Sequence, residues 1–248
     1  MTQKVDEWLQ VKSDSQYHDS QFLNPYKSTV AFVQWLMEKD IIKNEISEEI
    51  LDVGCGKGAN IFYLNKKFPN THFSGMDINQ ELIDEGNMIL QKHQMNSKLE
   101  VGDLYKENSS YLKRFDGIVS FQTLSWLPDF REPILSFSRM AKNWIAMTSL
   151  FFDGDLNCTI KVEDHNRKQH DGKPSEYFYN VYSLNLISEH LRNCGFPKLS
   201  YCQFEIDIDL ERTNPKGIGT YTEKLLNGRR IQFSGPLHLP WYFILAEK

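Results

Sequence analysis

Length, composition and charge restrict the classes of protein to which this chain can belong. It has 248 residues, of which 40% are hydrophobic and 25% charged, as expected for one globular domain, or one core with elaborations. The formal net charge of -5 argues against a strongly basic surface for nucleic acid. The chain shows neither an apolar run long enough to cross a membrane nor the start of a signal peptide. We therefore expect a cytoplasmic protein with no nucleic-acid or membrane partner.

The cysteines give no sign of a metal centre or of a disulfide framework. Cys55, Cys158, Cys194 and Cys202 are scattered, without the paired spacing of zinc ligands. We predict no metal site. The sequence leaves a homo-oligomer open, because no pattern in it reports on self-association.

Residues 1–46 form the first region, and we expect them to be mostly helical. Apolar residues of Thr29–Lys39 recur at helical spacing. The preceding stretch, Tyr17–Tyr26, is both polar and aromatic. The sequence therefore predicts a helical cap or lid at this end of the chain.

Residues 47–150 show apolar runs that alternate with helical patterns. Asn79 is placed to cap one of the helices and Asp129 another, with Pro133 in the first turns of the latter. Strands that alternate with helices predict a parallel sheet covered on both faces. The predicted strands are Ile50–Val53, Thr71–Asp77, Leu99–Asp103, Phe115–Phe121 and Trp144–Leu150.

Residues 151–183 are polar apart from a closing aromatic run, and we interpret them as an insertion that caps the substrate side. Residues 184–248 then supply the remainder of the sheet. They begin with a helix from Ser183 that stops at Gly195.

Three further patterns follow that helix. Strict alternation over Tyr201–Leu210 predicts a half-buried strand. Asn227-Gly228 predicts a type I′ turn within a hairpin insertion at about 211–236, joining Thr220–Leu226 to Arg229–Phe233. The last strand is predicted at Trp241–Ala246.

A glycine loop, Gly54-Cys55-Gly56-Lys57-Gly58, follows the first predicted strand. Open α/β sheets bind ligands at this position, and glycines let the backbone come close to the ligand. The spacing differs from the G-x-G-x-x-G of dinucleotide enzymes, and Asp52 before the loop would repel a pyrophosphate but attract a cation. Asp77 and Asp103 end the next two strands, where carboxylates suit ribose hydroxyls and an adenine amino group. The strand ends together carry the parts of a nucleoside site.

These motifs resemble those of the class I S-adenosylmethionine-dependent methyltransferases over about residues 48–150. Ile50–Gly58 is similar to motif I of that superfamily, and Asp77, Gly102-Asp103 and Phe115–Phe121 fall where it has its ribose, adenine and fourth-strand motifs. The resemblance implies a methyltransferase with S-adenosyl-L-methionine as cofactor. It also implies a Rossmann-like α/β fold with a seven-stranded, mostly parallel sheet, an antiparallel last strand and helices on both faces. The cofactor-binding residues it implies are Asp52, Gly54, Cys55, Gly56, Gly58, Asp77, Ile78, Asp103, Leu104, Phe121 and Gln122.

Catalytic groups must come from outside these motifs. Methyl transfer from a sulfonium mainly requires that the protein position the two reactants, but an oxygen nucleophile of high pKa also needs a base. We place His18, in the predicted lid, first among the candidates. His165 in the insertion and the hydroxyl of Tyr17 are the others, and an ordinary surface position is the alternative for each.

The methyl acceptor is the least determined part of the prediction. Trp126 is a candidate for the roof of the methyl site, with a core position as the alternative. The side chains of Tyr179 and Tyr182 are candidates for pocket hydroxyls. Tyr17–Ser28 and Gly228–Phe243 are similar to methyltransferases encoded with bacterial capsule and surface-polysaccharide genes. That second resemblance implies a sugar hydroxyl on a nucleotide-linked sugar, or a small phosphorylated precursor. Its phosphate would then bind Arg229 or Arg230, which match that geometry bidentately, unless both are simply solvated.

Two other functions remain open on the sequence. One is methylation of RNA or protein, and the other is a non-catalytic subunit that binds the cofactor. Ser120-Phe121-Gln122-Thr123 stands where methyltransferases of amino nitrogens have an Asn/Asp-Pro-Pro-Tyr tetrapeptide, which favours an oxygen acceptor. The intact acids Asp52, Asp77 and Asp103 favour an active enzyme.

Overall fold

The structure is a computed structural model, and it describes residues 21–43, 47–106, 108–168, 172–214 and 216–248. The predicted lid residues Tyr17 and His18 lie outside the described residues, as does His170. Within the first region, the described part contains helix α3, Lys27–Glu38, as its helical spacing predicted.

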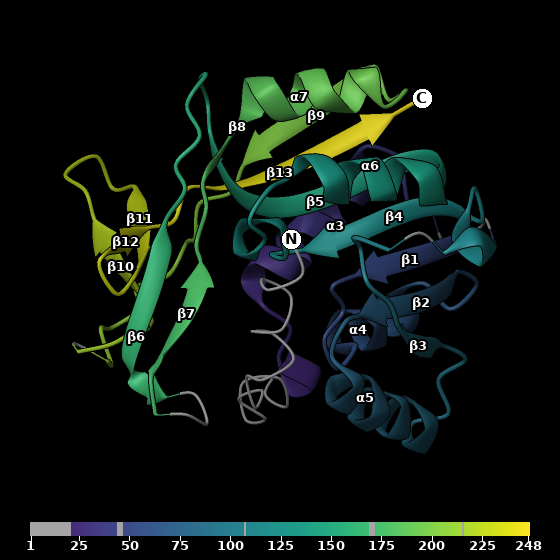
Figure 1. The fold of residues 1–248 in the computed structure, drawn as a ribbon, viewed down its shortest axis with the longest axis horizontal. Helices are drawn as coiled ribbons and strands as arrows, with labels where there is room; N and C mark the ends of the chain where they lie inside the picture. Colours follow the sequence, from purple (N-terminus) through teal and green to yellow (C-terminus); the bar gives the residue numbers. More distant parts are fainter. Residues whose placement is uncertain (1–20, 44–46, 107, 169–171, 215) are drawn as a thin grey trace.

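A single twisted sheet organises the chain, in the strand order β3-β2-β1-β4-β5-β13-β9 (Figure 1). The first five strands of this order run parallel, and β13 is antiparallel to both β5 and β9. This confirms the predicted Rossmann-like sheet, to which the short strand β8 adds an eighth member by pairing with β5. The bounds are β1 Glu49–Val53, β2 His72–Asp77, β3 Lys98–Val101, β4 Phe115–Phe121, β5 Ala141–Phe152, β8 Tyr182–Ser183, β9 Lys198–Gln203 and β13 Trp241–Glu247.

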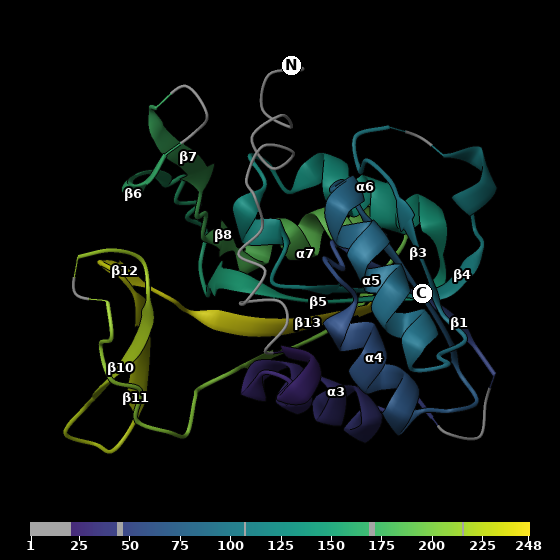
Figure 2. The same cartoon turned by 90° about the horizontal axis from the view of Figure 1, so that it is seen from below.

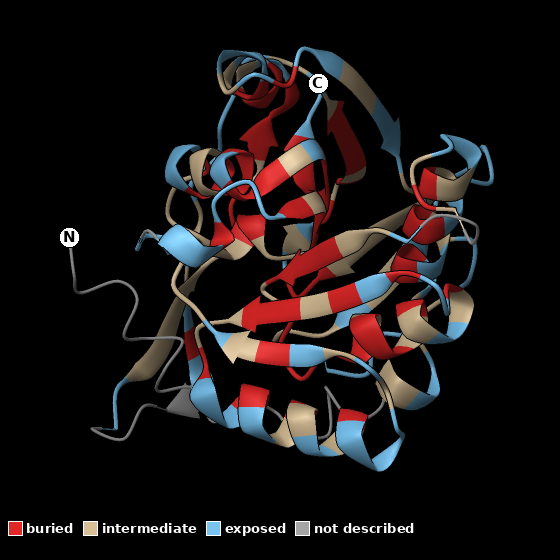
Figure 3. Cartoon of the chain, turned by 90° about the vertical axis from the view of Figure 1, so that its right-hand side faces the viewer, coloured by how far each residue is buried: buried red, intermediate tan, exposed pale blue. Residues whose placement is uncertain are grey.

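Helices cover both faces of the sheet. Apolar residues of α3, α4 (Ala59–Lys67) and α5 (Gln80–Lys92) pack in one core cluster, and those of α6 (Arg131–Met140) and α7 (Leu184–Asn193) pack in another. Figure 2 shows the two helical layers on opposite sides of β5 and β13. The central strands are therefore buried on both faces, which is why they read as continuous apolar runs (Figure 3).

Local signals start the helices where the sequence predicted. Asn79 accepts hydrogen bonds from the backbone N–H groups of Glu81 and Leu82, and so caps α5. Ser183 caps α7 in the same way, through the N–H of Leu186. Before α6, Asp129 accepts from the N–H of Arg131 at 2.5 Å, although Phe130 occupies the cap position itself.

Two accessory β units stand beside the carboxyl ends of the parallel strands. The insertion forms the hairpin of β6 (Lys161–Lys168) and β7 (Pro174–Phe178). A three-stranded sheet of β10 (Thr220–Lys224), β11 (Arg230–Ser234) and β12 (Leu237–His238) forms the second unit, at the far end of the molecule from β3 (Figure 1). Short 3₁₀ turns at Ser109–Tyr111 and Leu124–Trp126 precede and follow β4.

The predicted strand over Tyr201–Leu210 was wrong beyond Gln203, where β9 ends. The acids that alternate there do not form the solvent face of a strand. Glu205 and Asp209 pair instead with arginines of the β10–β11 hairpin, and Asp207 pairs with Lys27 of α3. After Gln203 the segment therefore contacts α3 and the β10–β11 hairpin instead of continuing β9.

The hairpin at Asn227-Gly228 was predicted correctly, but its turn type was not. Gly228 has a φ of 85°, whereas Asn227 keeps a negative φ and so cannot form a type I′ turn. The N–H of Gly228 donates to the carbonyl of Leu225, and the N–H of Leu225 donates to that of Arg229. This is the longer hairpin loop in which a left-handed glycine follows an ordinary turn.

Candidate cofactor and acceptor site

The glycine loop makes a left-handed bend between β1 and α4. Gly54, Gly56 and Gly58 have φ values of 76°, 53° and 77°, a region that side chains with a Cβ rarely adopt. A Cβ built on Gly54 would lie 2.3 Å from the Oγ1 of Thr123, so the loop also packs closely against the segment after β4. The backbone of the loop can therefore approach a ligand only because these positions are glycine.

Asp77, at the end of β2, holds the middle of this loop. Its Oδ2 accepts from the N–H of Gly56 at 2.9 Å, and its Oδ1 accepts from the N–H of Asn79 at the same distance. Burial raises the pKa of Asp77, and the backbone hydrogen bonds act in the opposite direction. The carboxylate predicted to bind a ribose thus also fixes the bend.

Asp52 is the least satisfied group at the site. It is 1% exposed, and neither carboxylate oxygen has a hydrogen-bond partner among the described residues. Burial, followed by the nearby charge of Asp77, raises the pKa of Asp52 well above its usual range. Two carboxyl groups next to a glycine bend, one of them unpartnered, suit a ligand that carries positive charge, as S-adenosylmethionine does at its sulfonium and ammonium groups.

Lys57, in the same loop, was not singled out by the sequence. Its side chain is 1% exposed and forms an ion pair with Glu85 of α5. A Cβ on the neighbouring Gly86 would lie 2.5 Å from the backbone oxygen of Lys57, so α5 packs directly on the loop. The sequence shows only a lysine in the glycine loop. It does not show the ion pair, because the partner Glu85 belongs to α5, further along the chain.

The other predicted cofactor residues line the same edge of the sheet, with one exception. Asp103 and Leu104 border a cavity of about 390 Å³ beside the loop that follows β3, and Asp103 accepts from the N–H of Tyr105 at 2.9 Å. Ile78 follows Asp77 and is half-buried. Cys55 is the exception, because its thiol is buried against Gly75 and only its backbone can face a ligand.

Phe121 ends β4 and Gln122 follows it, next to the glycine loop. The ring of Phe121 packs edge-on against Phe32 of α3, at 5.4 Å between centroids. Gln122 has a φ of 57°, a left-handed conformation that costs a residue with a side chain roughly 1–2 kcal/mol. Strain of this kind persists only where the surrounding structure holds it.

An aromatic cluster borders this edge on the side of the insertion. Trp126 lies edge-on to Tyr179 at 4.5 Å and near Tyr177 at 5.5 Å. Asn180, which is fully buried, donates from its backbone N–H to the carbonyl of Ser125. The β6–β7 hairpin is thereby attached to the segment after β4, which carries Trp126.

Tyr182, by contrast, lies in the hydrophobic core formed with α6 and α7. It is 3% exposed, and its hydroxyl donates to the carbonyl of Leu127 at 2.6 Å. The hydroxyl that was a candidate for the acceptor pocket therefore satisfies a backbone carbonyl.

The remaining predicted residues lie on the accessory units. His165 is exposed on β6. Arg229 forms a bidentate ion pair with Glu205, and Arg230 pairs with Asp209, with Nε to Oδ1 at 2.7 Å. Both guanidinium groups therefore already have carboxylate partners, which a phosphate would have to displace.

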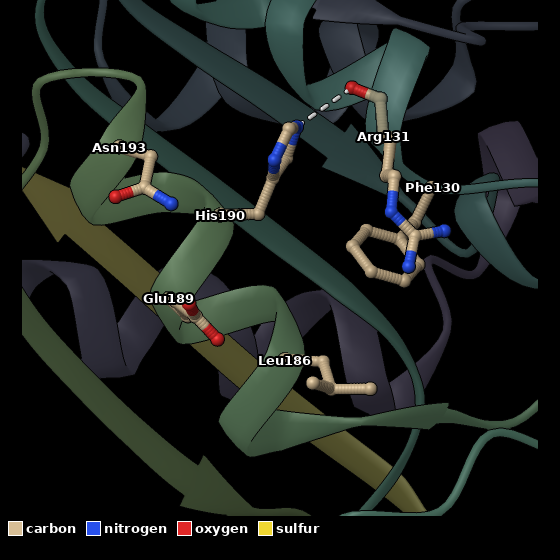
Figure 4. A pocket seen from close by; sticks show the side chains of 6 residues that line it. All are labelled: Phe130, Arg131, Leu186, Glu189, His190 and Asn193. Carbon is tan, nitrogen blue, oxygen red and sulfur yellow. Dashed lines mark hydrogen bonds between the residues drawn. The ribbon is translucent and has the colours of Figure 1, made fainter.

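A second hollow, of about 230 Å³, lies between the start of α6 and α7 (Figure 4). It is bordered by Phe130, Arg131 and His190, and the Nε2 of His190 lies 2.9 Å from the carbonyl oxygen of Arg131. None of the predicted site residues lines it. Among the described residues we find no group of His, Cys, Asp and Glu that could hold a metal ion, and no helix long and apolar enough to cross a membrane.

Comparison with known proteins decides which family this site represents. A family model described as a methyltransferase domain matches residues 45–181, more than half of the chain. The chain belongs to this methyltransferase family. This agrees with the resemblance of the glycine loop and the strand-end carboxylates to methyltransferase motifs.

Individual relatives of this methyltransferase are distant. It is 28% identical over 79 residues to the ribosomal RNA small subunit methyltransferase C of Haemophilus influenzae, covering 32% of this chain and 23% of that protein. The matched part therefore spans less than a quarter of that relative.

Solved structures share the fold. The YcgJ protein of Bacillus subtilis has a TM-score of 0.58 at 14% identity, covering 88% of this chain and 98% of that one. Magnesium protoporphyrin IX methyltransferase of Synechocystis, solved with bound S-adenosylhomocysteine, has a TM-score of 0.54 at 12% identity, covering 90% and 82%. At these identities the likeness concerns the architecture alone.

Proposed function

We propose that this methyltransferase transfers a methyl group from S-adenosylmethionine to an oxygen of a small polar acceptor. The unpartnered carboxyl of Asp52 beside the glycine bend carries the cofactor part of the proposal. The bound cofactor supplies the electrophilic methyl group, and the chain has to position the acceptor and exclude water.

The residues proposed to hold the cofactor follow the order of the strands. Asp103 and Leu104, after β3, take the adenine, and Asp77, after β2, takes the ribose. The bend from Gly54 to Gly58 and the end of β4 are then left for the methionine part. The cavity beside Asp103 supports this order, because an adenine needs a partly enclosed space next to that carboxylate.

The acceptor side is proposed to lie between the end of β4 and the β6–β7 hairpin. Trp126, with Tyr177 and Tyr179 packed on it, offers an aromatic surface there, suited to the face of a sugar or another ring. The segment after β4 lacks the tetrapeptide of amino-nitrogen methyltransferases, which supports an oxygen acceptor. A nucleotide-linked sugar or a small phosphorylated precursor of surface-polysaccharide synthesis fits this chemistry, and His18 stays the predicted base.

A second candidate is transfer to RNA, which the similarity to a ribosomal RNA methyltransferase over 79 residues favours. The net charge of -5 counts against it, because binding to a phosphate backbone relies on Lys and Arg. The two candidates differ in the product that carries the methyl group.

The test is incubation with S-adenosylmethionine labelled in its methyl group and a panel of nucleotide sugars, phosphorylated small molecules and bulk RNA. We expect mass spectrometry to show one added methyl on a member of the small-molecule panel and none on RNA. The Asp77→Ala variant serves as the inactive control. Label found only in RNA would contradict the oxygen-acceptor proposal in favour of the second candidate.

A further inference from the structure

The first turn of α3 contacts two segments that lie beside the glycine loop: the residues after β4 and the start of α4. Ser28 and Thr29 are buried, at 9% and 3% exposure. The Nε2 of Gln122, just after β4, donates to the Oγ of Ser28 at 3.0 Å. On the other side, the Oγ1 of Thr29 donates to the Oδ1 of Asn60 at 3.1 Å, in the first turn of α4. One helical turn from outside the parallel core thus joins the two segments.

The contact at Gln122 occurs where the backbone is strained. Gln122 adopts a left-handed φ of 57°, and its N–H donates to the carbonyl of Thr148. A glycine would adopt this conformation freely, so the backbone alone gives no reason for a glutamine. With its amide nitrogen bound to Ser28, the carboxamide has its Oε1 left as an acceptor, to which no described residue donates.

The order of the strands, with the proposed placement of the nucleoside, indicates which part of the cofactor lies near Gln122. Asp77 ends β2 and Asp103 follows β3, on one side of β1, whereas Gln122 follows β4 on the other side. Thr123, the next residue, packs against Gly54. With the nucleoside at β2 and β3, the end of β4 adjoins the methionine part, whose ammonium group is a hydrogen-bond donor.

We propose that Ser28, Thr29, Asn60 and Gln122 form a latch by which α3 prepares the cofactor site. The latch holds Gln122, in the segment already proposed to adjoin the methionine part, with its Oε1 as an acceptor for that part. Ser28 holds the carboxamide of Gln122, and Thr29 holds Asn60 beside the glycine bend. Segments held in place before binding lose less conformational entropy when the ligand arrives. The inference rests on the proposed placement of the cofactor, and its test separates the two.

The experiment measures the Kd of S-adenosylhomocysteine by calorimetry for wild type, Ser28→Ala, Gln122→Gly and the double variant. We expect Ser28→Ala and Gln122→Gly each to raise the Kd roughly tenfold, the effect of one well-placed hydrogen bond to a charged group. The double variant should be no weaker than Gln122→Gly alone, because both changes remove the same contact. Methylthioadenosine, which lacks the amino-acid part, should bind all four proteins equally.

The stability of the Gln122→Gly variant separates a role of Gln122 in cofactor binding from a purely structural role. Gln122→Gly relieves the left-handed strain, so its urea midpoint should equal or exceed that of the wild type while its affinity for S-adenosylhomocysteine falls. Ser138→Ala is the matched control: this buried serine donates to the carbonyl of Leu135 within α6, and its loss should leave the Kd unchanged.

Two outcomes would overturn the latch. One is a Kd within twofold of the wild type for Gln122→Gly, in a protein where Asp77→Ala removes binding. The other is an equal loss of affinity for methylthioadenosine and S-adenosylhomocysteine. If Asp77→Ala also binds normally, the placement of the cofactor fails together with the latch.

Discussion

Replacing Asp77 by alanine is expected to abolish measurable binding of S-adenosylmethionine. The side chain has two tasks in this account: its oxygens accept from the N–H groups of Gly56 and Asn79, and it is the proposed partner of the ribose. A hydrogen bond to a charged group contributes about 1.5–3 kcal/mol, so losing the two that Asp77 is proposed to accept from the ribose hydroxyls raises the Kd roughly a hundredfold or more. Calorimetric titration of the purified variant measures this directly.

A matched control separates the site from the general loss of a carboxylate. Asp116 also accepts a backbone N–H, that of Glu49, but at the opposite end of the sheet. Asp116→Ala should keep wild-type affinity for the cofactor. If the Asp77→Ala variant binds the cofactor with unchanged affinity, Asp77 does not hold the ribose.

Asp52→Asn should stabilise the ligand-free protein and weaken its binding of the cationic cofactor. Burial and the charge of Asp77 raise the pKa of Asp52 in the folded state. A raised carboxyl pKa means that the native state binds more protons than the unfolded state above the ordinary pKa, so stability falls as the pH rises toward the raised value. The asparagine variant lacks this fall. Above the raised pKa it should be the more stable protein, because each unit by which the pKa of a carboxyl is raised costs about 1.4 kcal/mol that a neutral amide does not incur.

Asp52→Asn also tests whether the site prefers a ligand that carries the positive charge of a sulfonium. S-adenosylmethionine carries a sulfonium that S-adenosylhomocysteine lacks, so Asp52→Asn should lose more affinity for the former. Urea unfolding across the acid to neutral range and paired titrations give the two readouts. A variant that is less stable than wild type at neutral pH, with equal losses for both ligands, would show that Asp52 acts only as a packing residue.

Local signals account for the parts of the fold that the sequence predicted. Asn79 and Ser183 cap helices through contacts within three residues, and the apolar run of β1 leads directly into its glycine bend. Asp77 was identified from its position after a strand, and the structure places it against Gly56. Such features depend on neighbours in the chain, and a single sequence contains them.

The features that could not be predicted from the sequence depend on residues that are far apart in the chain. Ser28 and Gln122 are 94 residues apart, and nothing near either residue indicates the other. Arg229 appeared to be a candidate for phosphate because its partner, Glu205, belongs to a segment predicted as a regular strand. Tyr182 was interpreted as a pocket residue because its aromatic neighbours gave no information on which side of the sheet it lies.

The central claim is that the bend after β1 and the carboxyl groups of Asp52 and Asp77 bind the adenosyl cofactor. A crystal structure with S-adenosylhomocysteine tests it most directly. The account predicts density along Gly54–Gly58, with the ribose at Asp77 and the adenine beside Asp103. Density elsewhere, for example in the hollow between α6 and α7, with no contact to either carboxylate, would contradict it.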